Sequence, residues 1–388
     1  MIIGITIEVV CSIFDGDKMW KELPIDTKSS VSQLKVITPK PEVSVDLPAI
    51  YKFESTRIIS LADIRFYASV FEDQNYQVLD PSMAPIYDGL ILRLTHNRKQ
   101  IGLIVAIAHR IRLSSEISPK ISPEIPDGIS GVMSGLTTCL AIKPAYQSRG
   151  LAGDLIKLLM VRGLDDGVIS GYFYGLKPKT LSAIPVRSWY RLIDVVEAHR
   201  LGYGITIPKV GSLDSIADQL EVAKRFFAIT VTPSLSVRPT IWSDFETLTR
   251  RQIMLDLIEA DFERFKLGSI TWMTVVGPEH RMIFGVKPYR LVKPNQTTIP
   301  AGLLVYCETD GPITNPLEFK TYFDMILHTC REMGYVALHG VATGCLSFGV
   351  AEFLGPLLAI DSGLMFLDFY NLCTGRTRNP ADVSLLYA

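Results

Sequence analysis

The sequence predicts an α/β protein, and three observations lead to that prediction. Apolar runs typical of strands alternate with segments whose apolar residues recur at helical spacing, over a chain of 388 residues. Apolar residues make up 48% and charged residues 20% of the chain, so large buried cores are expected. A helix followed by glycine and a strand occurs at residues 151–174 and again at residues 315–338. This repeat favours two related α/β halves that meet near residue 215, but any α/β protein contains such units, and both interpretations stay open.

The elements expected in the first half follow from apolar patterning and from helix-starting residues. Ser60 followed by Asp63 is an N-cap pattern that predicts a helix. In residues 151–162 the apolar positions lie on one helical face, which predicts a helix packed on a sheet. The Pro-rich residues 37–48 and 114–130 are expected to form surface loops, the second as an insertion between strands. Strands are expected at residues 1–14, 89–94, 101–108, 136–142 and 169–174.

The second half contains the clearest helix of the sequence. Asn315 followed by Pro316 predicts where it begins, and Gly334 predicts where it ends. A strand is expected directly afterwards, at residues 336–338, and Ser243 followed by Glu246 predicts a further helix start. The buried face of the main helix is expected to hold Phe319, Tyr322, Phe323, Ile326, Cys330 and Met333.

The charge balance argues against several classes of partner. Lys and Arg total 39 and Asp and Glu total 40, a net charge of −1, so neither a nucleic-acid groove nor a polybasic membrane anchor is expected. No apolar run reaches the ~18–20 residues of a membrane span; residues 340–369 come closest and are interrupted by Glu352 and Asp361. The N-terminus carries Glu8 and lacks a basic leader, so a strand is expected there and not a signal peptide.

The cysteines and histidines are dispersed along the chain. The absence of a CxxC pair argues against a disulfide framework and against a zinc site, and it favours a reducing compartment such as the cytoplasm. The six histidines are equally scattered, so no metal site is expected. The cysteines are Cys11, Cys139, Cys307, Cys330, Cys345 and Cys373.

The segment most informative about chemistry is residues 136–162, LTTCLAIKPAYQSRGLAGDLIKLLMVR. A strand meets a turn containing Pro144, then Gln147-x-x-Gly150-x-Ala152, then a helix. This order gathers free backbone N–H groups at a helix N-terminus, where a pyrophosphate can bind, and Gly150 allows the ligand to approach closely. No Lys or Thr follows in the manner of a P-loop, so nucleotide hydrolysis is disfavoured. An ordinary strand–turn–helix unit is the alternative.

These residues resemble the acyl-CoA signature of the GNAT acyltransferase superfamily, and further blocks narrow the resemblance. Residues 137–153 (TTCLAIKPAYQSRGLAG) and 185–195 (PVRSWYRLIDV) are similar to the two central blocks of the glycylpeptide N-tetradecanoyltransferase (N-myristoyltransferase) family. Four other blocks also resemble that family and come in its order: DKMW at 17–20, SVRP at 236–239, SGLMFLDFYN at 362–371 and VSLLYA at 383–388.

The resemblance implies an α/β fold of two tandem GNAT-like halves that share one continuous, saddle-shaped mixed sheet with flanking helices. Residues 1–215 would form the N-terminal half, which binds acyl-CoA, and residues 216–388 the C-terminal half, which binds peptide. The implied activity is transfer of a long-chain acyl group, with myristoyl expected, to the N-terminal glycine of proteins. Long-chain acyl-CoA would be a co-substrate, with no permanently bound cofactor.

The resemblance also implies the roles of individual residues. The backbone amides of Cys139 and Leu140 would polarise the thioester oxygen, so side-chain changes there need not abolish activity. The carboxylate of Ala388 would accept the proton of the glycine ammonium. Tyr190 and Tyr306 would line the peptide pocket, although either could be a core residue. Acyl-CoA would be bound by Ala141, Ser148, Arg149, Gly150, Leu151 and Ala152, under a lid formed by Asp17, Lys18, Met19 and Trp20.

Several departures from the family pattern keep two alternatives open. The family's Asn-Phe-Leu is Thr138-Cys139-Leu140 here, and a polar Thr of the family corresponds to Gly175. The Gly-Asp-Gly of the family is reduced to residues 361–363, DSG. These changes would suit a catalytically inactive binding or structural relative. A GNAT enzyme that uses a short acyl-CoA and a small amine is the second alternative, against which the apolar C-terminus argues.

Overall fold

The computed structural model describes residues 35–36, 45, 47–72, 78–79, 88–113, 131–175, 178–180, 183–203, 215–248, 251–257, 259–267, 270–292, 298–347, 360–373 and 379–386. The strand expected at residues 1–14 and the loop at 114–130 lie outside these ranges. The strands are β1 (Lys35–Val36), β2 (Tyr51–Ile58), β3 (Val78–Leu79), β4 (Asp88–His96), β5 (Lys99–Leu113), β6 (Gly131–Ile142), β7 (Ser170–Gly175), β8 (Ile184–Leu192), β9 (Ser236–Pro239), β10 (Ile253–Leu255), β11 (Thr271–Val276), β12 (Arg281–Val292), β13 (Thr298–Thr309), β14 (Ala337–Val341), β15 (Ile360–Tyr370), β16 (Leu372–Cys373) and β17 (Val383–Ser384). The α-helices are α3 (Leu61–Glu72), α4 (Leu151–Asp165), α5 (Val195–Arg200), α6 (Ile216–Phe226), α7 (Glu259–Leu267) and α8 (Pro316–Glu332).

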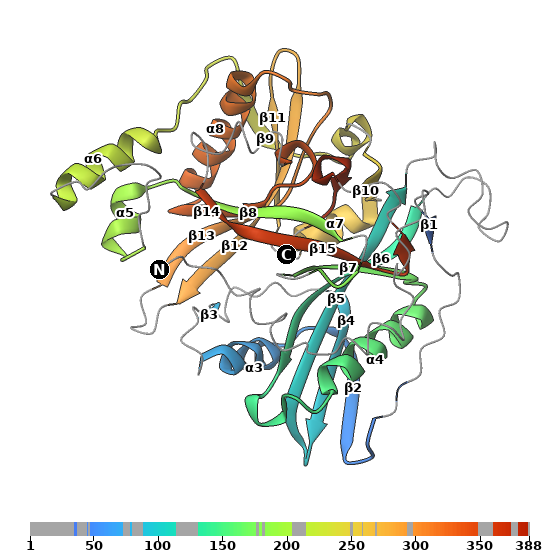
Figure 1. Cartoon of the computed structure of the whole chain (residues 1–388). Helices are drawn as coiled ribbons and strands as arrows, with labels where there is room; N and C mark the ends of the chain where they lie inside the picture. The colour runs from blue at the N-terminus through green and yellow to red at the C-terminus, as the bar shows by residue number, and fades with distance from the viewer. Residues whose placement is uncertain are drawn as a thin grey trace.

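One mixed sheet joins both halves of the chain (Figure 1). Among the described residues it has 15 strands, with the main order β17-β10-β5-β6-β7-β15-β8-β14-β13-β12-β11-β9. The pairs β6–β7, β13–β14 and β10–β17 are parallel, and the other pairs in this path are antiparallel. Strands from the second half of the chain enter the first half, because β15 lies between β7 and β8 and β10 pairs with β5. The fold is therefore α/β, as the sequence patterns predict, with a single continuous sheet, as the family resemblance implies.

Helices cover both faces of the strands β4, β5 and β6. Successive residues of a strand point to opposite faces. Leu92 and Leu94 accordingly pack with Leu155 of α4, whereas Ile91 packs with Phe66 of α3 on the other face. In the second half, α8 packs its apolar stripe against β12 and β13 in a separate cluster. Because strands β4, β5 and β6 are covered on both faces, they form a rigid support for the turn that joins β6 to α4.

The helix boundaries follow local capping chemistry in most cases. At the start of α3 the Ser60 backbone N–H donates to Asp63 Oδ2 (2.8 Å) and the Asp63 N–H donates to Ser60 Oγ (3.2 Å), the reciprocal pattern of a capping box. Asn315 caps α8 by accepting the Leu317 N–H at 3.0 Å, and Gly334 follows that helix at a φ of 83°. The helix start predicted at Ser243 is instead a short 3-10 helix, η4 (Trp242–Thr247), in which Asp244 accepts the Ile241 N–H.

Candidate functional site

Strand β6 departs from regular pairing at Cys139. Leu103 of β5 pairs with Ala141, but Val105 pairs with Thr138, so Ile104 alone stands opposite both Cys139 and Leu140. This is a β-bulge, and Cys139 adopts a φ of 51°, in the left-handed region that non-glycine residues seldom occupy. The bulge therefore takes the backbone amides of Cys139 and Leu140 out of the ordinary ladder.

The neighbouring strand diverges close to the same point. The parallel ladder between β6 and β7 ends where Leu136 pairs with Tyr172, and β7 continues by pairing with β15. The bulge thus lies just beyond the end of this ladder, at an opening between two parallel strands. Strained backbone at such a position is typical of functional sites, where fixed amide dipoles are aimed at a ligand.

The turn from β6 to α4 has a backbone geometry that can bind an anion at a helix start. Ser148 and Gly150 adopt φ angles of 60° and 78°, and a turn with such left-handed residues can orient successive N–H groups toward one point. Gln147 Nε2 donates to the Ile142 carbonyl (3.0 Å) and holds the turn against the strand. Gly150 is the N-cap of α4 and offers no side chain to the first amides of the helix, so their N–H groups are available to a ligand.

The predicted acyl-CoA contacts divide into exposed and buried residues. Ser148, Arg149 and Gly150 are exposed at the turn, and the Arg149 guanidinium donates to the Ala145 carbonyl (3.0 Å). Leu151 is buried in the core under α4, so it can meet a phosphate only through its backbone N–H. The side chains of Ala152 and Ala141 pack, respectively, in this cluster and in the cluster under α3. Residues 17–20, the predicted lid, lie outside the described residues.

Lys287 of β12 brings a charge from the second half to the bulge. It interacts electrostatically with Cys139, and burial lowers the pKa of Lys287 from 10.5 to about 8. Burial also raises the pKa of the Cys139 thiol, so this thiol stays protonated and is a poor nucleophile. The arrangement thus favours backbone amides and a nearby cation, rather than a reactive cysteine, as the polar elements at the bulge.

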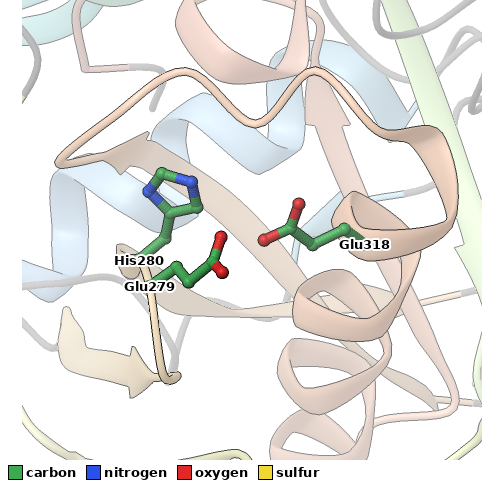
Figure 2. A group of neighbouring side chains, drawn as sticks. All are labelled: Glu279, His280 and Glu318. Atoms are coloured by element: carbon green, nitrogen blue, oxygen red, sulfur yellow. The ribbon is translucent and has the colours of Figure 1, made fainter.

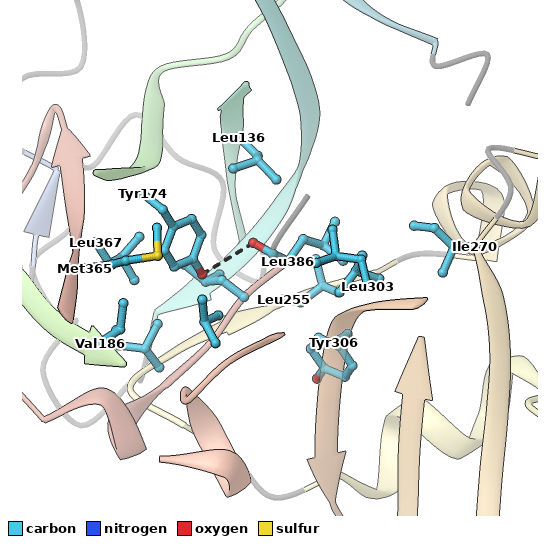
Figure 3. Packing of buried hydrophobic residues seen from close by; sticks show 14 of the residues in the cluster. Leu136, Tyr174, Val186, Leu255, Ile270, Leu303, Tyr306, Met365, Leu367 and Leu386 are labelled. Carbon is cyan, nitrogen blue, oxygen red and sulfur yellow. Dashed lines mark hydrogen bonds between the residues drawn. The ribbon is translucent and has the colours of Figure 1, made fainter. Parts of the chain in front are cut away.

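The C-terminal segment is buried against the first half. Strand β17 pairs in parallel with β10, and Leu385 and Leu386 are buried in the main core cluster. Figure 3 shows the Leu386 carbonyl hydrogen-bonded to the Tyr174 hydroxyl, with Leu303 near Leu386 on the other side. Ala388, the predicted proton acceptor, lies outside the described residues.

The two predicted peptide-pocket tyrosines are buried in the same cluster as Leu386. Tyr190 stacks on His339 with ring centroids 6.0 Å apart, and Tyr306 contacts Trp272 at 5.7 Å. His339 in turn is 3.0 Å, through Nε2, from the Tyr203 hydroxyl, and burial lowers the pKa of this histidine to about 4. His339 is therefore neutral at neutral pH, whereas Tyr306 lies close to the buried Glu308, whose Oε1 is 2.7 Å from the Arg251 guanidinium.

The comparisons with known proteins agree on one architecture. No protein-family model matches the chain, and no curated sequence matches it significantly. Three Saccharomyces cerevisiae N-myristoyltransferase structures with bound myristoyl-CoA are similar in fold, at TM-scores of 0.64, 0.67 and 0.65 and identities of 13%, 14% and 14%. Each similarity covers 95% of this chain, and it covers 99%, 96% and 94% of the yeast chains.

The chain has the N-myristoyltransferase fold. The near-complete coverage of both chains means that this fold spans the first and second halves together. Among the helices that the structure describes, none has the length and apolarity needed to cross a bilayer.

A separate cluster on this N-myristoyltransferase fold has the donors of a metal site. Figure 2 shows Glu279 and His280, at the β11–β12 turn, facing Glu318 at the start of α8, with ligand atoms within 4.8 Å of one another. His280 Nδ1 is also 3.6 Å from Asp310 Oδ1. The sequence predicts no metal site, and a cluster of this kind leaves no signal in the sequence because Glu318 is remote from the other two donors. These residues belong to other elements than the β6–α4 turn.

Sequence reasoning also missed polar residues of the main core that the two-residue strand period could have revealed. His109 shares the β5 face of Ile107 and Ile111, and Tyr172 and Tyr174 alternate on β7. Lys287 shares the β12 face of Ile283 by the same period. A polar residue at a core-facing strand position is the signal in each case.

The lowered pKa of Lys287 predicts a pH dependence of stability. Between about pH 8 and pH 10.5 the unfolded chain holds a proton that the folded chain has released, so the free energy of unfolding increases as the pH rises. We expect the free energy of unfolding to increase by an amount on the order of 2 kcal/mol over this range. This increase should be absent in Lys287→Met. Denaturant titrations at pH 7.5, 9 and 10 measure it, with Lys52→Met, on the exposed face of β2, as the matched control. An unchanged pH slope in Lys287→Met would contradict the burial of this charge.

Proposed function

We propose that the chain is a cytoplasmic, acyl-CoA-dependent N-acyltransferase that modifies N-terminal glycines of proteins, with myristoyl-CoA as the expected donor. The observation that carries this proposal is the bulge at Cys139 and Leu140, which leads directly into the open N-terminus of α4. The bulge suits a thioester carbonyl and the helix start suits a pyrophosphate. One continuous segment could therefore bind both the thioester and the pyrophosphate of an acyl-CoA. The N-myristoyltransferase fold supports the same reading.

The proposed chemistry is attack of an amine on a thioester. The glycine nitrogen, once it has lost one proton, forms a bond to the thioester carbon, and the oxygen takes up negative charge. The C–S bond then breaks, the nitrogen releases its second proton, and the CoA thiolate takes up a proton and leaves as the thiol. Two backbone N–H groups aimed at the oxygen stabilise that charge without reorganising, which contributes about 10²–10³ in rate for one such donor. Lys287 adds a positive potential close to Cys139 and favours the same charge.

The amine must lose a proton before it attacks. The α-ammonium group has a pKa near ~8 and a terminal carboxylate one near ~3.5, so the carboxylate accepts this proton efficiently only when it is close and partly desolvated. Buried Leu385 and Leu386 support that setting for the carboxylate of Ala388, which we propose as the proton acceptor. The neutral His339 that stacks on Tyr190 suits an uncharged part of an N-terminal peptide segment.

Acyl-CoA would contact the turn through Ser148, Arg149 and Gly150 and through the backbone of Leu151 and Ala152. In this proposal residues 17–20 close over the bound CoA. Residues 1–215 would thus supply the acyl-CoA site and residues 216–388 most of the peptide site. The strands β15 and β17 cross that division, so each half would depend on the other for a complete site.

The direct test combines the purified chain with myristoyl-CoA and a glycine-initiated peptide. We expect the peptide to gain one myristoyl group by mass spectrometry, with one equivalent of free CoA thiol released. The same peptide with an acetylated N-terminus is the control, because it lacks the attacking amine. The proposal fails if the chain neither binds long-chain acyl-CoA nor acylates the peptide.

The same experiment separates the two alternatives. An inactive relative would bind peptide or acyl-CoA in calorimetry without transfer at any pH, an outcome that the changes at Thr138 and Gly175 motivate. A short-chain enzyme would turn over acetyl-CoA faster than myristoyl-CoA. We expect the reverse order of turnover, since the segment that ends the described chain is apolar and buried.

A further inference from the structure

A row of buried polar side chains lies under the C-terminal segment. His109 of β5 pairs with Ser134 of β6, which pairs with Ser170 of β7, and all three are buried. Tyr172, two residues after Ser170, shares their face of the sheet and is 0% exposed. Burying polar groups in an otherwise apolar cluster costs free energy unless they make hydrogen bonds, so this row calls for a physical explanation.

The row ends in hydrogen bonds to the backbone of Leu386. His109 Nδ1 is 3.0 Å from the Ile107 carbonyl oxygen, and His109 Nε2 is 2.9 Å from the Tyr172 hydroxyl. The Tyr172 hydroxyl also lies 3.3 Å from the Leu386 carbonyl oxygen, and the Tyr174 hydroxyl approaches the same oxygen at 3.5 Å. Two tyrosines thus converge on one carbonyl, two residues before Ala388.

Counting hydrogens shows how these groups share their bonds. The Ile107 carbonyl can only accept, so His109 Nδ1 carries a hydrogen and, in a neutral ring, Nε2 is an acceptor. Tyr172 has one hydrogen, which it gives either to His109 Nε2 or to Leu386. His109 therefore competes with Leu386 for the Tyr172 hydrogen, while Tyr174 donates to Leu386.

We propose that Tyr172 and Tyr174 are positioning residues, which hold the C-terminal segment by the Leu386 carbonyl, and that His109 sets the share of the Tyr172 hydrogen that Leu386 receives. This inference rests on the proposed function, in which the carboxylate of Ala388 accepts the proton. Two residues span at most about 7 Å, so fixing Leu386 confines the carboxylate to a small region. Without the two hydroxyls, the last residues would regain conformational freedom.

The hydroxyl groups can be removed with little change in packing. Tyr172 contacts His109 edge-to-face at 5.5 Å between ring centroids and Phe369 at 6.1 Å, and phenylalanine keeps both ring contacts. The test variants are Tyr172→Phe, Tyr174→Phe and the double variant. Tyr370→Phe is the matched control, because Tyr370 is a buried tyrosine of the adjacent strand β15 whose hydroxyl has no hydrogen-bond partner among the described residues.

Two measurements are made on each variant of the full chain. Hydrogen–deuterium exchange of residues 383–388 reports release of the segment directly, and steady-state kinetics with myristoyl-CoA and a glycine-initiated peptide report positioning. The net contribution of one hydrogen bond changes an equilibrium constant by a factor of about five. We therefore expect exchange about fivefold faster in Tyr174→Phe and up to about thirtyfold faster in the double variant. We expect kcat to fall by similar factors while KM for acyl-CoA stays within about twofold, and Tyr370→Phe to match the wild type.

His109→Leu tests the competition for the Tyr172 hydrogen. Its expected effect on hydrogen–deuterium exchange is opposite to that of the tyrosine variants. Removing the imidazole leaves Leu386 as the acceptor for Tyr172, so exchange of residues 383–388 should slow or stay at the wild-type rate. If this variant does not fold, the tyrosine variants still decide the proposal.

The outcomes separate this inference from the proposed function. Unchanged hydrogen–deuterium exchange of residues 383–388 in the folded double variant would overturn the proposal that the two tyrosines hold Leu386, whatever the activity. Faster exchange with unchanged kcat would overturn their positioning role. If the wild type lacks transferase activity but residues 383–388 exchange faster in the double variant, the proposed function fails. The proposal that Tyr172 and Tyr174 hold Leu386 then stands.

Discussion

Extending the chain by a few residues after Ala388 is expected to lower kcat for acyl transfer by about a hundredfold or more, the scale of a lost general base. The extension moves the carboxylate away while every side chain stays, and the anchored Leu386 backbone keeps the preceding residues in position. In the proposed function acyl-CoA binds around Gly150, so its Kd should stay within about twofold. Stopped-flow or steady-state release of CoA thiol measures kcat, and calorimetry measures Kd.

The control for the extension is Ala388→Leu. This variant keeps a terminal carboxylate at the same backbone position and adds only apolar volume, so kcat should remain close to that of the wild type. Turnover that survives the extension would remove Ala388 from the mechanism. In that event Lys287, with its pKa of about 8, would be the next group to test as the proton acceptor.

Replacing Ser148 by aspartate is expected to raise the Kd for acyl-CoA about tenfold or more. Two like charges about 4 Å apart repel by about 1–4 kcal/mol between the dielectric limits of water and of a protein surface. The charge would face a pyrophosphate held at the start of α4. The matched control is Ser148→Asn, since Asn and Asp have nearly the same shape and both tolerate the left-handed φ of 60° at this position.

The stability of the Ser148 variants separates charge repulsion from misfolding. A carboxylate near a helix N-terminus interacts favourably with the helix dipole, so Ser148→Asp should be at least as stable as Ser148→Asn. Thermal unfolding measures this, and calorimetric titration with myristoyl-CoA measures the Kd. Equal Kd values for the two variants would show that no anionic group binds at this turn.

Local patterns predicted local elements well. The Ser60 and Asn315 caps, the glycine after α8 and the helix that starts at Leu151 all depend on contacts within a few residues, and the structure confirms each one. The Ser243 prediction was wrong, because Asp244 accepts the Ile241 N–H and binds Arg238 across the sheet edge, which favours a short 3-10 turn. Contacts between residues three and six apart thus favoured the 3-10 turn over the predicted helix.

Strand lengths were underestimated because strand ends depend on pairing partners. A strand was predicted to end at residue 108, whereas β5 runs to Leu113, since β6 pairs with it as far as Arg112 and β10 pairs with residues 111–113. Partners that are separated from a strand in the sequence leave no local signal at its end. The predicted boundary near residue 215 likewise says nothing of β15, which the tertiary structure inserts between two strands of the first half.

The sequence by itself determined the α/β class, the helix that follows Gly150 and the open helix start that could bind a pyrophosphate, because these properties depend on neighbours along the chain. Only the tertiary structure decided that Cys139 occupies a bulge at a positive φ, that Lys287 lies close enough to Cys139 to interact with it, and that Tyr172 and Tyr174 hold Leu386. Each of these depends on register and packing between segments far apart in sequence, and such pairing is set by burial of the whole sheet rather than by any local pattern.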